Sequence, residues 1–320
     1  MRVAVIDDWQ EVAQGCADWN RLEGRARVTF FAEPFTNEAA AATALAGFEV
    51  IVPMRERTKF TRSLLERLTD LRLLALTGYG TRHIDTAYCA ERGIVCCGSG
   101  AYSPAGTAEY ALALLLAAAR HVPQADAAMR AGRFQQQIPL GKVLEGKVLG
   151  VLGLGRIGAR VAAFGQALGM KVIAWSSNLT AERTAELGVE YVAKHELFAR
   201  ADAVTLHLVL SPRSQGIVGA TEIAAMKPGA ILVNTSRGPL IDEAALLSAL
   251  REGRITAALD VYDQEPLPAG HELRRLGHVV LSPHLGFCTS EGFEVFYGES
   301  LENIFGWLSG TPLRVIALTP

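Results

Sequence analysis

The stretch Val148-Leu-Gly-Val-Leu-Gly153-Leu-Gly155-Arg156-Ile157-Gly158 decides the fold of this chain. Its apolar beginning is typical of a buried parallel strand, and the spaced glycines follow where such a strand would turn into a helix. The first glycine permits a tight turn, the second lets the backbone approach a pyrophosphate, and the third lets helix and strand pack closely. We therefore predict a dinucleotide loop formed by Gly153, Gly155, Arg156, Ile157 and Gly158. The alternative is a turn whose glycines only solve a packing problem.

Apolar runs rich in β-branched residues alternate with helix-length amphipathic segments on both sides of this loop, which indicates an α/β protein with parallel strands. Six runs fit a Rossmann-type, doubly wound nucleotide-binding domain, at residues 148–152, 171–175, 203–207, 230–234, 257–261 and 279–282. Five earlier runs predict a smaller, flavodoxin-like sheet, at residues 3–6, 28–31, 49–53, 73–76 and 94–97.

The chain is expected to cross between these two domains twice. Ser103-Pro104 opens an Ala/Leu-rich helix with proline near its first turn. Residues 290–308 are predicted to form a helix that returns to the first domain, followed by a short terminal strand after Gly310-Thr-Pro312. Residues 1–101 and 290–320 would then form a substrate domain, residues 102–289 a dinucleotide-binding domain, and the active site a cleft between them.

Composition excludes several classes of partner. The 320 residues carry 31 basic and 33 acidic side chains, so the chain offers no basic field for nucleic acid or for an anionic membrane. The longest apolar run, at residues 110–119, is about half of a membrane span. The five cysteines lack C-x-x-C spacing and indicate reduced thiols in a cytoplasmic protein. No metal site is predicted.

Two polar residues follow predicted strands of the second domain, at the edge where ligands bind in such sheets. Arg237 lies before a Gly238-Pro239 turn, and its guanidinium can hold a substrate carboxylate and polarise the adjacent carbonyl. His284 lies between Pro283 and Gly286, and an imidazole exchanges protons near neutral pH. The alternative for the arginine is a surface charge.

Two carboxylates lie near the end of the fifth predicted strand of the same domain, Asp260 in its last residues and Glu265 after it. Glu265 is expected to orient the His284 ring and to favour its protonated form, although it could be a solvated turn residue. Asp260 could accept from a nicotinamide carboxamide or could cap its loop, and both roles stay open. A cation, a carboxylate and an imidazole downstream of a dinucleotide site are what a carbonyl needs for hydride transfer.

The identity of the dinucleotide stays open between NAD and NADP. An NAD site usually carries an acidic residue after the second strand, and here that position reads Ser176-Ser177-Asn178. These side chains could bond to a 2′-phosphate, but no arginine or lysine lies among them to clamp it. Thr235 and His207 are also predicted to bind the cofactor, with core filling as the alternative for His207.

The first domain contributes a glycine turn, Leu76-Thr-Gly78-Tyr79-Gly80, whose N–H groups could bind a carboxylate. Tyr79 and Gly80 are therefore candidate substrate-binding residues, together with Arg237 and His284. Arg55, Arg57 and Lys59 follow another strand; because Glu56 interleaves these charges, a solvated loop is the preferred interpretation, with an anionic substrate pocket as the alternative.

These residues resemble the D-isomer-specific 2-hydroxyacid dehydrogenase family. The resemblance covers nearly the whole chain and includes the set Arg237, Glu265 and His284, the loop VLGLGRIG, the Gly78–Gly80 turn and the split first domain. It implies that nicotinamide hydride reduces a 2-oxo acid while His284 donates a proton, assisted by Glu265. Arg237 and the glycine-turn amides would hold the carboxylate, and the reverse reaction would oxidise a D-2-hydroxy acid.

The resemblance further implies a homodimer through the nucleotide-binding domain, built by the helix from Ser103 and the arm at residues 123–134. Ser176 departs from the family pattern where an acidic residue is usual. An alternative function exists within the same fold, because the family includes corepressors that act as dinucleotide-sensing, protein-binding modules. The chain lacks the long disordered flanks expected of such a module.

Overall fold

A computed structural model describes residues 1–100 and 103–318. The chain divides into two compact units, Met1–Ser103 with Cys288–Pro320 (unit 1) and Pro104–Phe287 (unit 2). The predicted first boundary, between residues 101 and 102, lies outside the described residues. The chain re-enters unit 1 at Cys288, where the sequence predicts residue 290.

Unit 1 contains a five-stranded parallel sheet in the order β2-β1-β3-β4-β5, which is the flavodoxin-like order. Val3 of β1, the second strand in this order, lies beside Val28 on one side and Val50 on the other. The strands are short and apolar: β1 Arg2–Ile6, β2 Arg27–Phe30, β3 Val50–Pro53, β4 Leu73–Leu76 and β5 Val95–Gly98.

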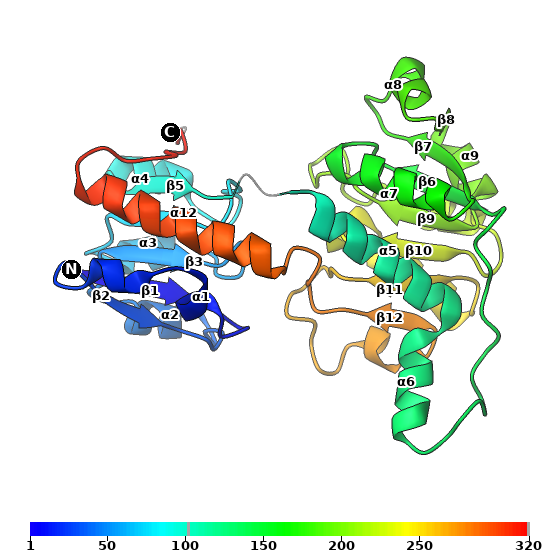
Figure 1. The fold of residues 1–320 in the computed structure, drawn as a ribbon, viewed down its shortest axis with the longest axis horizontal. Helices are drawn as coiled ribbons and strands as arrows, with labels where there is room; N and C mark the ends of the chain where they lie inside the picture. The colour runs from blue at the N-terminus through cyan, green and yellow to red at the C-terminus, as the bar shows by residue number, and fades with distance from the viewer. Residues whose placement is uncertain (101–102, 319–320) are drawn as a thin grey trace. The chain divides into compact units, whose positions relative to one another are not determined.

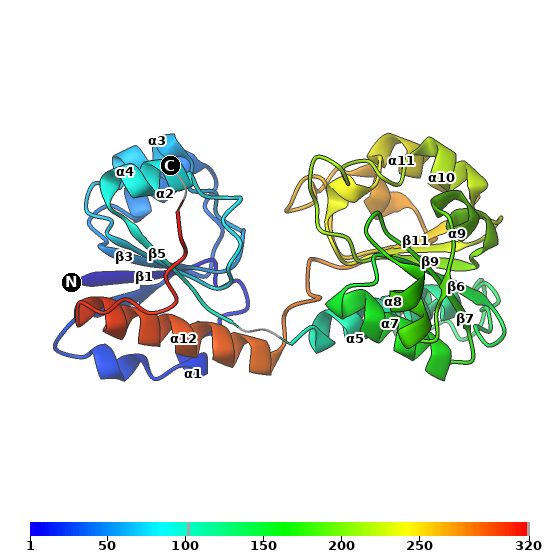
Figure 2. The same ribbon diagram turned by 90° about the horizontal axis from the view of Figure 1, so that it is seen from above.

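Helices cover both faces of this sheet, with α1 and α12 on one face and α2, α3 and α4 on the other (Figure 2). Side chains that accept from the first-turn amides mark their starts, for example Asn37, Thr61, Asp85 and Thr289. Their bounds are α1 Ala13–Cys16, η1 Trp19–Leu22, α2 Glu38–Ala44, α3 Arg62–Arg67, α4 Thr86–Arg92 and α12 Ser290–Leu308.

The C-terminal segment of unit 1 differs from its prediction. Val315 makes an isolated antiparallel bridge to Cys97, and no strand is assigned after α12 up to residue 318. Two backbone hydrogen bonds flank this bridge, from the Gly98 amide to the Arg314 carbonyl at 2.9 Å and from the Ile316 amide to the Cys96 carbonyl at 2.8 Å. Arg314 also donates to buried Asn303, which donates to the carbonyl of Gly98. The expected terminal strand is therefore reduced to a single bridge residue beside β5.

Unit 2 contains a seven-stranded parallel sheet in the order β12-β11-β10-β9-β6-β7-β8 (Figure 1). Strand order reverses between β6 and β9, and ligands of such sheets bind beyond the strand ends at this switch point. The sequence missed β8, a two-residue edge strand. The bounds are β6 Val148–Leu152, β7 Lys171–Trp175, β8 Glu190–Tyr191, β9 Ala203–Leu206, β10 Ile231–Asn234, β11 Thr256–Leu259 and β12 Val279–Leu281.

Both faces of this sheet are buried. Leu149 and Val151 of β6 pack with α5 and α7, whereas Leu152 packs on the opposite side with α9, α10 and α11. This double cover explains why the strands read as continuous apolar runs. The helices are α5 Ala105–Arg120, α6 Val122–Arg130, α7 Arg156–Ala167, α8 Ala181–Glu186, α9 Lys194–Arg200, α10 Ala220–Ala225, η2 Gly238–Leu240, α11 Glu243–Arg251 and η3 Glu272–Arg275.

Asp7, at the end of β1, is a buried carboxyl that makes the stability of unit 1 depend on pH. Oδ1 accepts from the Thr58 hydroxyl at 2.9 Å, but Oδ2 is buried and has no hydrogen-bond partner among the described residues. Burial raises the pKa of Asp7 to about 6. Since the folded-state pKa lies above the unfolded value, this group stabilises the fold at low pH, and the stability is lost as pH rises through about 6.

We expect Asp7→Asn to raise the unfolding free energy at pH 8 by about 1–2 kcal/mol and to change it little at pH 4. Asparagine tolerates the left-handed backbone of this position, where φ is +62°. Urea unfolding in a Trp175→Phe background reports unit 1, because the other tryptophans, Trp9, Trp19 and Trp307, lie there. Asp70→Asn at an exposed site is the control, and an equal effect at both pH values would contradict the assignment.

Candidate active site

The loop after β6 gives its three glycines three different surroundings. Gly153 has φ +103°, and a Cβ there would lie 2.7 Å from the carbonyl oxygen of His207. A Cβ on Gly158 would collide with the carbonyl of Gly153, so the helix packs directly on the turn. At Gly155 nothing lies within 4 Å of the Cβ position. Turn, open backbone and close packing are the three features that a pyrophosphate loop requires.

The residues at the start of α7 divide between surface and core. Gly155 is the N-cap residue and provides no side-chain acceptor for the first helical amides. Arg156 is exposed at this helix end, whereas Ile157 packs against the cluster between α5, α7 and the sheet. The amides and the positive end of a twelve-residue helix thus face the loop, which suits a phosphate.

The turn after β7 carries Ser176, Ser177 and Asn178, of which Ser176 is half-buried and the other two are exposed. The Ser176 carbonyl accepts from the amide of Leu179 at 3.1 Å and closes the turn. Arg183, the nearest arginine in sequence, pairs with Glu186 at 2.8 Å. The turn therefore offers hydroxyl and amide groups to a ribose or a 2′-phosphate.

His207 and Thr235 lie on neighbouring strand ends, because Leu206 pairs with Asn234 in the sheet. The His207 Nε2 atom lies 2.9 Å from the Thr205 hydroxyl. Its Nδ1 atom and the Thr235 Oγ1 atom are buried and have no hydrogen-bond partner within the described part of the chain. Burial lowers the pKa of His207 to about 3, so the ring is neutral. These two unsatisfied polar atoms, at the ends of β9 and β10, fit a polar ligand at the carboxyl edge of the sheet.

The loop after β10 fixes Arg237. The Asn234 side chain donates to the Arg237 carbonyl at 2.9 Å, and the Ser236 hydroxyl donates to the Leu206 carbonyl at 2.7 Å. The guanidinium Nη1 donates to the Ser236 carbonyl at 2.7 Å. A Cβ on Gly238 would collide with the backbone of Tyr262. The arginine loop is thus packed directly against the loop after β11.

Glu265 and His284 form a hydrogen-bonded pair. The His284 Nδ1 atom lies 2.6 Å from Glu265 Oε2, while Oε1 accepts from the amide of Tyr262 at 2.9 Å. Both side chains are about one-third exposed, at 32% and 33%. Glu265 engages Nδ1, and Nε2 is the other ring nitrogen that can exchange a proton. The structure thus brings together two of the three predicted catalytic side chains.

Asp260 fastens the loop that carries His284. This buried carboxylate accepts from the Ser282 hydroxyl at 2.6 Å and from the amides of Leu285 and Gly286 at 2.8 Å each. Its burial raises its pKa. His284 has φ +58°, a strained conformation for a non-glycine residue, which these bonds on both sides of it hold in place. The loop-capping role that the sequence left open is therefore present in the structure.

Sequence reasoning missed the hydroxyl groups that support this loop. The Tyr110 hydroxyl on α5 lies 2.6 Å from the Ser282 hydroxyl. The Tyr262 hydroxyl donates to the carbonyl of Ser282 at 2.8 Å. The sequence places only Ser282 next to this loop, directly before Pro283. The two tyrosines belong to other elements, so nothing in the sequence indicates that they contact it.

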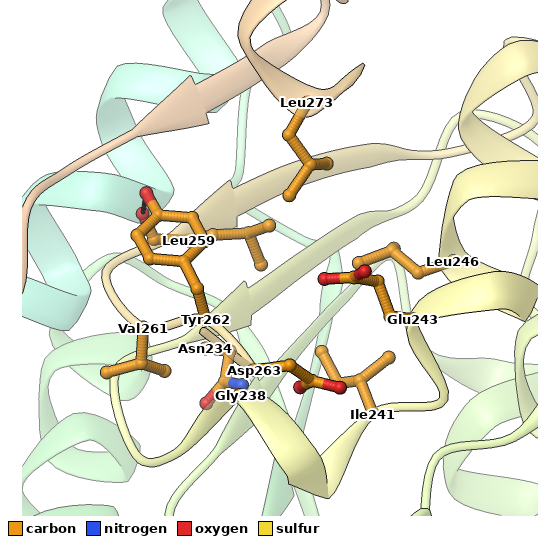
Figure 3. A pocket seen from close by; sticks show the side chains of 10 residues that line it. All are labelled: Asn234, Gly238, Ile241, Glu243, Leu246, Leu259, Val261, Tyr262, Asp263 and Leu273. Carbon is orange, nitrogen blue, oxygen red and sulfur yellow. Dashed lines mark hydrogen bonds between the residues drawn. The ribbon is translucent and has the colours of Figure 1, made fainter. Parts of the chain in front are cut away.

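A pocket opens beside the loops after β10 and β11 (Figure 3). Arg237, Glu265 and His284 are not among its lining residues. Burial and the neighbouring Glu243 and Asp242 raise the pKa of Asp263, so the surroundings are acidic. An anionic substrate does not suit such a pocket. The lining residues are Asn234, Gly238, Ile241, Glu243, Leu246, Leu259, Val261, Tyr262, Asp263 and Leu273.

The two remaining candidate residues, Tyr79 and Gly80, belong to unit 1. Tyr79 is exposed, and its ring lies over the backbone of Gly98, where a Cβ would meet Cδ1 at 2.5 Å. Gly78 has φ +136°, which only glycine adopts readily. The backbone of the glycine turn at residues 78–80 therefore lies next to the aromatic ring of Tyr79.

The prediction of a solvated loop at residues 55–59 is wrong for both arginines. Arg55 and Arg57 are half-buried, and only Lys59 is exposed. The Arg57 guanidinium donates to the carbonyl of Asp7 at 2.6 Å and lies 4.2 Å from the centre of the Trp9 ring. For Arg57, contacts with residues from a distant segment take the place of contacts with solvent.

Residues 1–100 and 103–318 lack two kinds of feature. No helix in these ranges has the length and apolar character needed to cross a membrane. No group of three histidine, cysteine or acidic side chains in them is arranged to hold a metal ion.

Comparison with known proteins identifies the family to which this chain is related. Residues 112–286 match the model of the D-isomer specific 2-hydroxyacid dehydrogenase, NAD binding domain. D-3-phosphoglycerate dehydrogenase from Methanocaldococcus jannaschii is 41% identical over 75% of this chain and 46% of its own length. Glyoxylate reductase from Aeropyrum pernix is 41% identical over 77% of this chain and 76% of its own.

The fold is shared with solved structures. A phosphoglycerate oxidoreductase from Vibrio cholerae has a TM-score of 0.92 and 36% identity, covering 97% of this chain and 99% of the other. The chain spans about half the length of the curated phosphoglycerate dehydrogenases that it matches, with 46%, 58% and 49% covered. From its matched domain, its relatives and its fold, the chain belongs to the D-isomer-specific 2-hydroxyacid dehydrogenase family.

Proposed function

We propose that this protein is an NAD(P)-dependent oxidoreductase that interconverts a 2-oxo acid and a D-2-hydroxy acid. The observation that carries the proposal is the 2.6 Å contact between His284 and Glu265 in the unit that also holds the glycine loop and Arg237. The matched family model and the relatives named D-3-phosphoglycerate dehydrogenase and glyoxylate reductase support it. The cofactor, the proton transfer and the substrate contacts below are parts of this proposal.

The residues around the switch point fit a nicotinamide dinucleotide, which supplies or accepts the hydride when bound. Gly153, Gly155 and Gly158, with the amides of Arg156 and Ile157, would hold the pyrophosphate. Support comes from the open backbone at Gly155 and from the unsatisfied atoms of His207 and Thr235. The residues proposed around the remaining groups of the cofactor are Ser176, Ser177, Asn178, His207 and Thr235, whereas both oxygens of Asp260 are bonded to the loop that carries His284.

His284 is proposed as the group that exchanges a proton with the substrate oxygen. In reduction of a 2-oxo acid, its Nε2–H would donate to the carbonyl oxygen as that oxygen gains negative charge, and in oxidation Nε2 would take the proton back. Glu265 accepts from Nδ1–H and so would fix the orientation of the ring and the position of its protons. The amide of Tyr262 holds the other carboxylate oxygen and thereby fixes the pair.

Arg237 would bind the substrate carboxylate and polarise the carbonyl beside it. A guanidinium presents several donors in a plane, and one of them is already fixed on the Ser236 carbonyl. Tyr79 and Gly80 would contribute backbone donors from the glycine turn of unit 1. A positive group beside the reacting carbonyl lowers the cost of its developing charge.

A homodimer through unit 2 is part of the proposal. Large apolar side chains are exposed along α6 and the segment after it, namely Val122 at 53%, Met129 at 56%, Phe134 at 66% and Leu140 at 95%. A run of exposed apolar side chains of this kind is typical of a surface that another chain covers. Symmetric pairing of two copies would bury the same arm on both.

We expect His284→Ala to lower kcat for reduction of a 2-oxo acid roughly 10²- to 10⁴-fold, because the proton donor is removed. Glu265→Gln should lower kcat less, since the imidazole remains but its charged partner is lost. Steady-state assays of several 2-oxo acids with NADH and NADPH give these values. His195→Ala, on an exposed position of α9, is the matched control. A His284→Ala enzyme with wild-type kcat would refute the assignment.

Cofactor choice is tested at Ser176. An acidic side chain there would accept from the ribose hydroxyls of NAD and repel the 2′-phosphate of NADP. We therefore expect Ser176→Asp to raise the ratio of kcat/KM for NADH over NADPH at least roughly ten-fold, with Ser176→Asn as the uncharged control. An unchanged ratio would show that the turn after β7 does not lie at the 2′ position.

A further inference from the structure

The loop that carries His284 is tied to α5, the first helix of unit 2, by a chain of hydrogen bonds between side chains. The Tyr110 hydroxyl on α5 lies 2.6 Å from the Ser282 hydroxyl, which donates to Asp260 Oδ1 at 2.6 Å. Asp260 in turn accepts from two backbone amides of the loop. His284 therefore lies between two parts of one network, with Ser282 before it in sequence and the two amides after it.

The direction of this chain follows from the number of protons available. A serine hydroxyl has one proton, and an ionised carboxylate can only accept. Because the proton of Ser282 lies in its bond to Asp260, the bond between the two hydroxyls has Tyr110 as its donor. Hydrogen bonds in such a chain polarise one another, so the bond from Tyr110 strengthens the one that Ser282 makes to the carboxylate.

Asp260 depends on its donors because it is completely buried. Burial raises its pKa, whereas the hydrogen bonds from Ser282 and from the amides of Leu285 and Gly286 lower it. Hydrogen bonds to a charged acceptor are stronger than those to a neutral one, and losing one of them leaves a buried charge less well paired. A donor to Ser282 therefore acts on Asp260 through the serine.

Packing places Tyr110 where it makes this bond. Its ring is partly buried against the apolar cluster between α5, α7 and the sheet. It also borders the His284 loop, since a Cβ on Gly286 would lie 3.8 Å from Tyr110 Cδ1 and 3.6 Å from Thr107 Cγ2. The position of the hydroxyl is therefore set by the packing of the ring.

The backbone of Ser282 has partners of its own. Its amide donates to the Leu259 carbonyl at 2.9 Å, and its carbonyl accepts from the Tyr262 hydroxyl at 2.8 Å. These bonds keep the end of β12 in place when the Tyr110 hydroxyl is absent. The loss of that hydroxyl then weakens the hold of the Ser282 side chain on Asp260.

We propose that Tyr110 is a positioning residue, which holds the His284 imidazole in place for proton exchange. It acts through Ser282 and Asp260. This inference rests on the proposed function, because it takes His284 as the group that exchanges a proton with the substrate. His284 needs such a hold, since its φ of +58° is strained for a non-glycine residue. Loss of the Tyr110 hydroxyl lets the loop relax and displaces the imidazole from the reacting oxygen.

Tyr110→Phe tests the proposal, because it removes one oxygen atom and keeps the packed ring. Glyoxylate, pyruvate and phosphohydroxypyruvate are assayed, and the one that wild type reduces fastest is used. Tyr110→Phe should lower kcat about ten-fold or more and leave KM for the dinucleotide within about two-fold, since displacing a reacting group is costly. Ser282→Ala breaks the same chain, so in that background Tyr110→Phe should change kcat little. Tyr191→Phe, at an exposed site on β8, is the control and should leave kcat unaltered.

A spectroscopic measurement separates this inference from the proposed function. In protein with ¹⁵N-labelled histidine, the ring signals of His284 are identified by their absence from His284→Ala, and they report the bond of Nδ1 to Glu265. Tyr110→Phe should shift or broaden them, and Tyr191→Phe should not.

If no 2-oxo acid is reduced with either cofactor, the proposed function fails, yet this change in the His284 signals would still support the hold of Tyr110 on the ring. Unchanged His284 signals, a wild-type kcat in Tyr110→Phe, or a loss of kcat that persists in full in the Ser282→Ala background would each overturn the inference.

Discussion

The buried carboxylate of Asp260 is the interaction on which the site of unit 2 depends. It accepts three hydrogen bonds from the loop after β12, one from the Ser282 hydroxyl and two from backbone amides on the far side of His284. A buried carboxylate needs these donors because losing its hydration costs several kcal/mol. The loop in turn needs the carboxylate, since His284 is held in a left-handed conformation. Each therefore fixes the other.

The parallel sheet explains how residues far apart in the sequence meet at this point. Strands β10, β11 and β12 are neighbours, and the carboxyl ends of parallel strands lie at one edge. Arg237 follows the first of them, Glu265 the second and His284 the third. Gly238 lets the first loop lie directly on the second, and the Glu265–His284 bond joins the second to the third. The glycine loop after β6 shares this edge.

Much of this architecture could be predicted because it depends on local pattern. The limits of β6, β7 and α12 were predicted to the residue, since doubly covered strands and a capped helix leave clear apolar runs and stops. The roles of the glycines followed from their spacing, and the environments of Gly153, Gly155 and Gly158 agree with them. The strand β8, two residues long and at the sheet edge, has no apolar run to reveal it.

Side-chain partners from distant segments could not be predicted. Arg55 and Arg57 looked solvated in sequence because Glu56 lies between them, but Thr77 and Asp7 bind them in the fold. Tyr110, whose hydroxyl lies 2.6 Å from that of Ser282, belongs to α5, which precedes the glycine loop along the chain, whereas Ser282 follows it. Such pairs are decided by packing between elements, and a single sequence carries no periodicity that marks them.

The most direct test is a double-mutant cycle between Asp260 and His284. If Asp260 acts by holding the His284 loop, Asp260→Asn lowers kcat strongly in the wild-type background and changes it little in a His284→Ala background. Circular dichroism of each variant confirms that the fold is retained. Equal, additive losses in the two backgrounds would contradict the account, because they would show that Asp260 contributes to catalysis independently of His284.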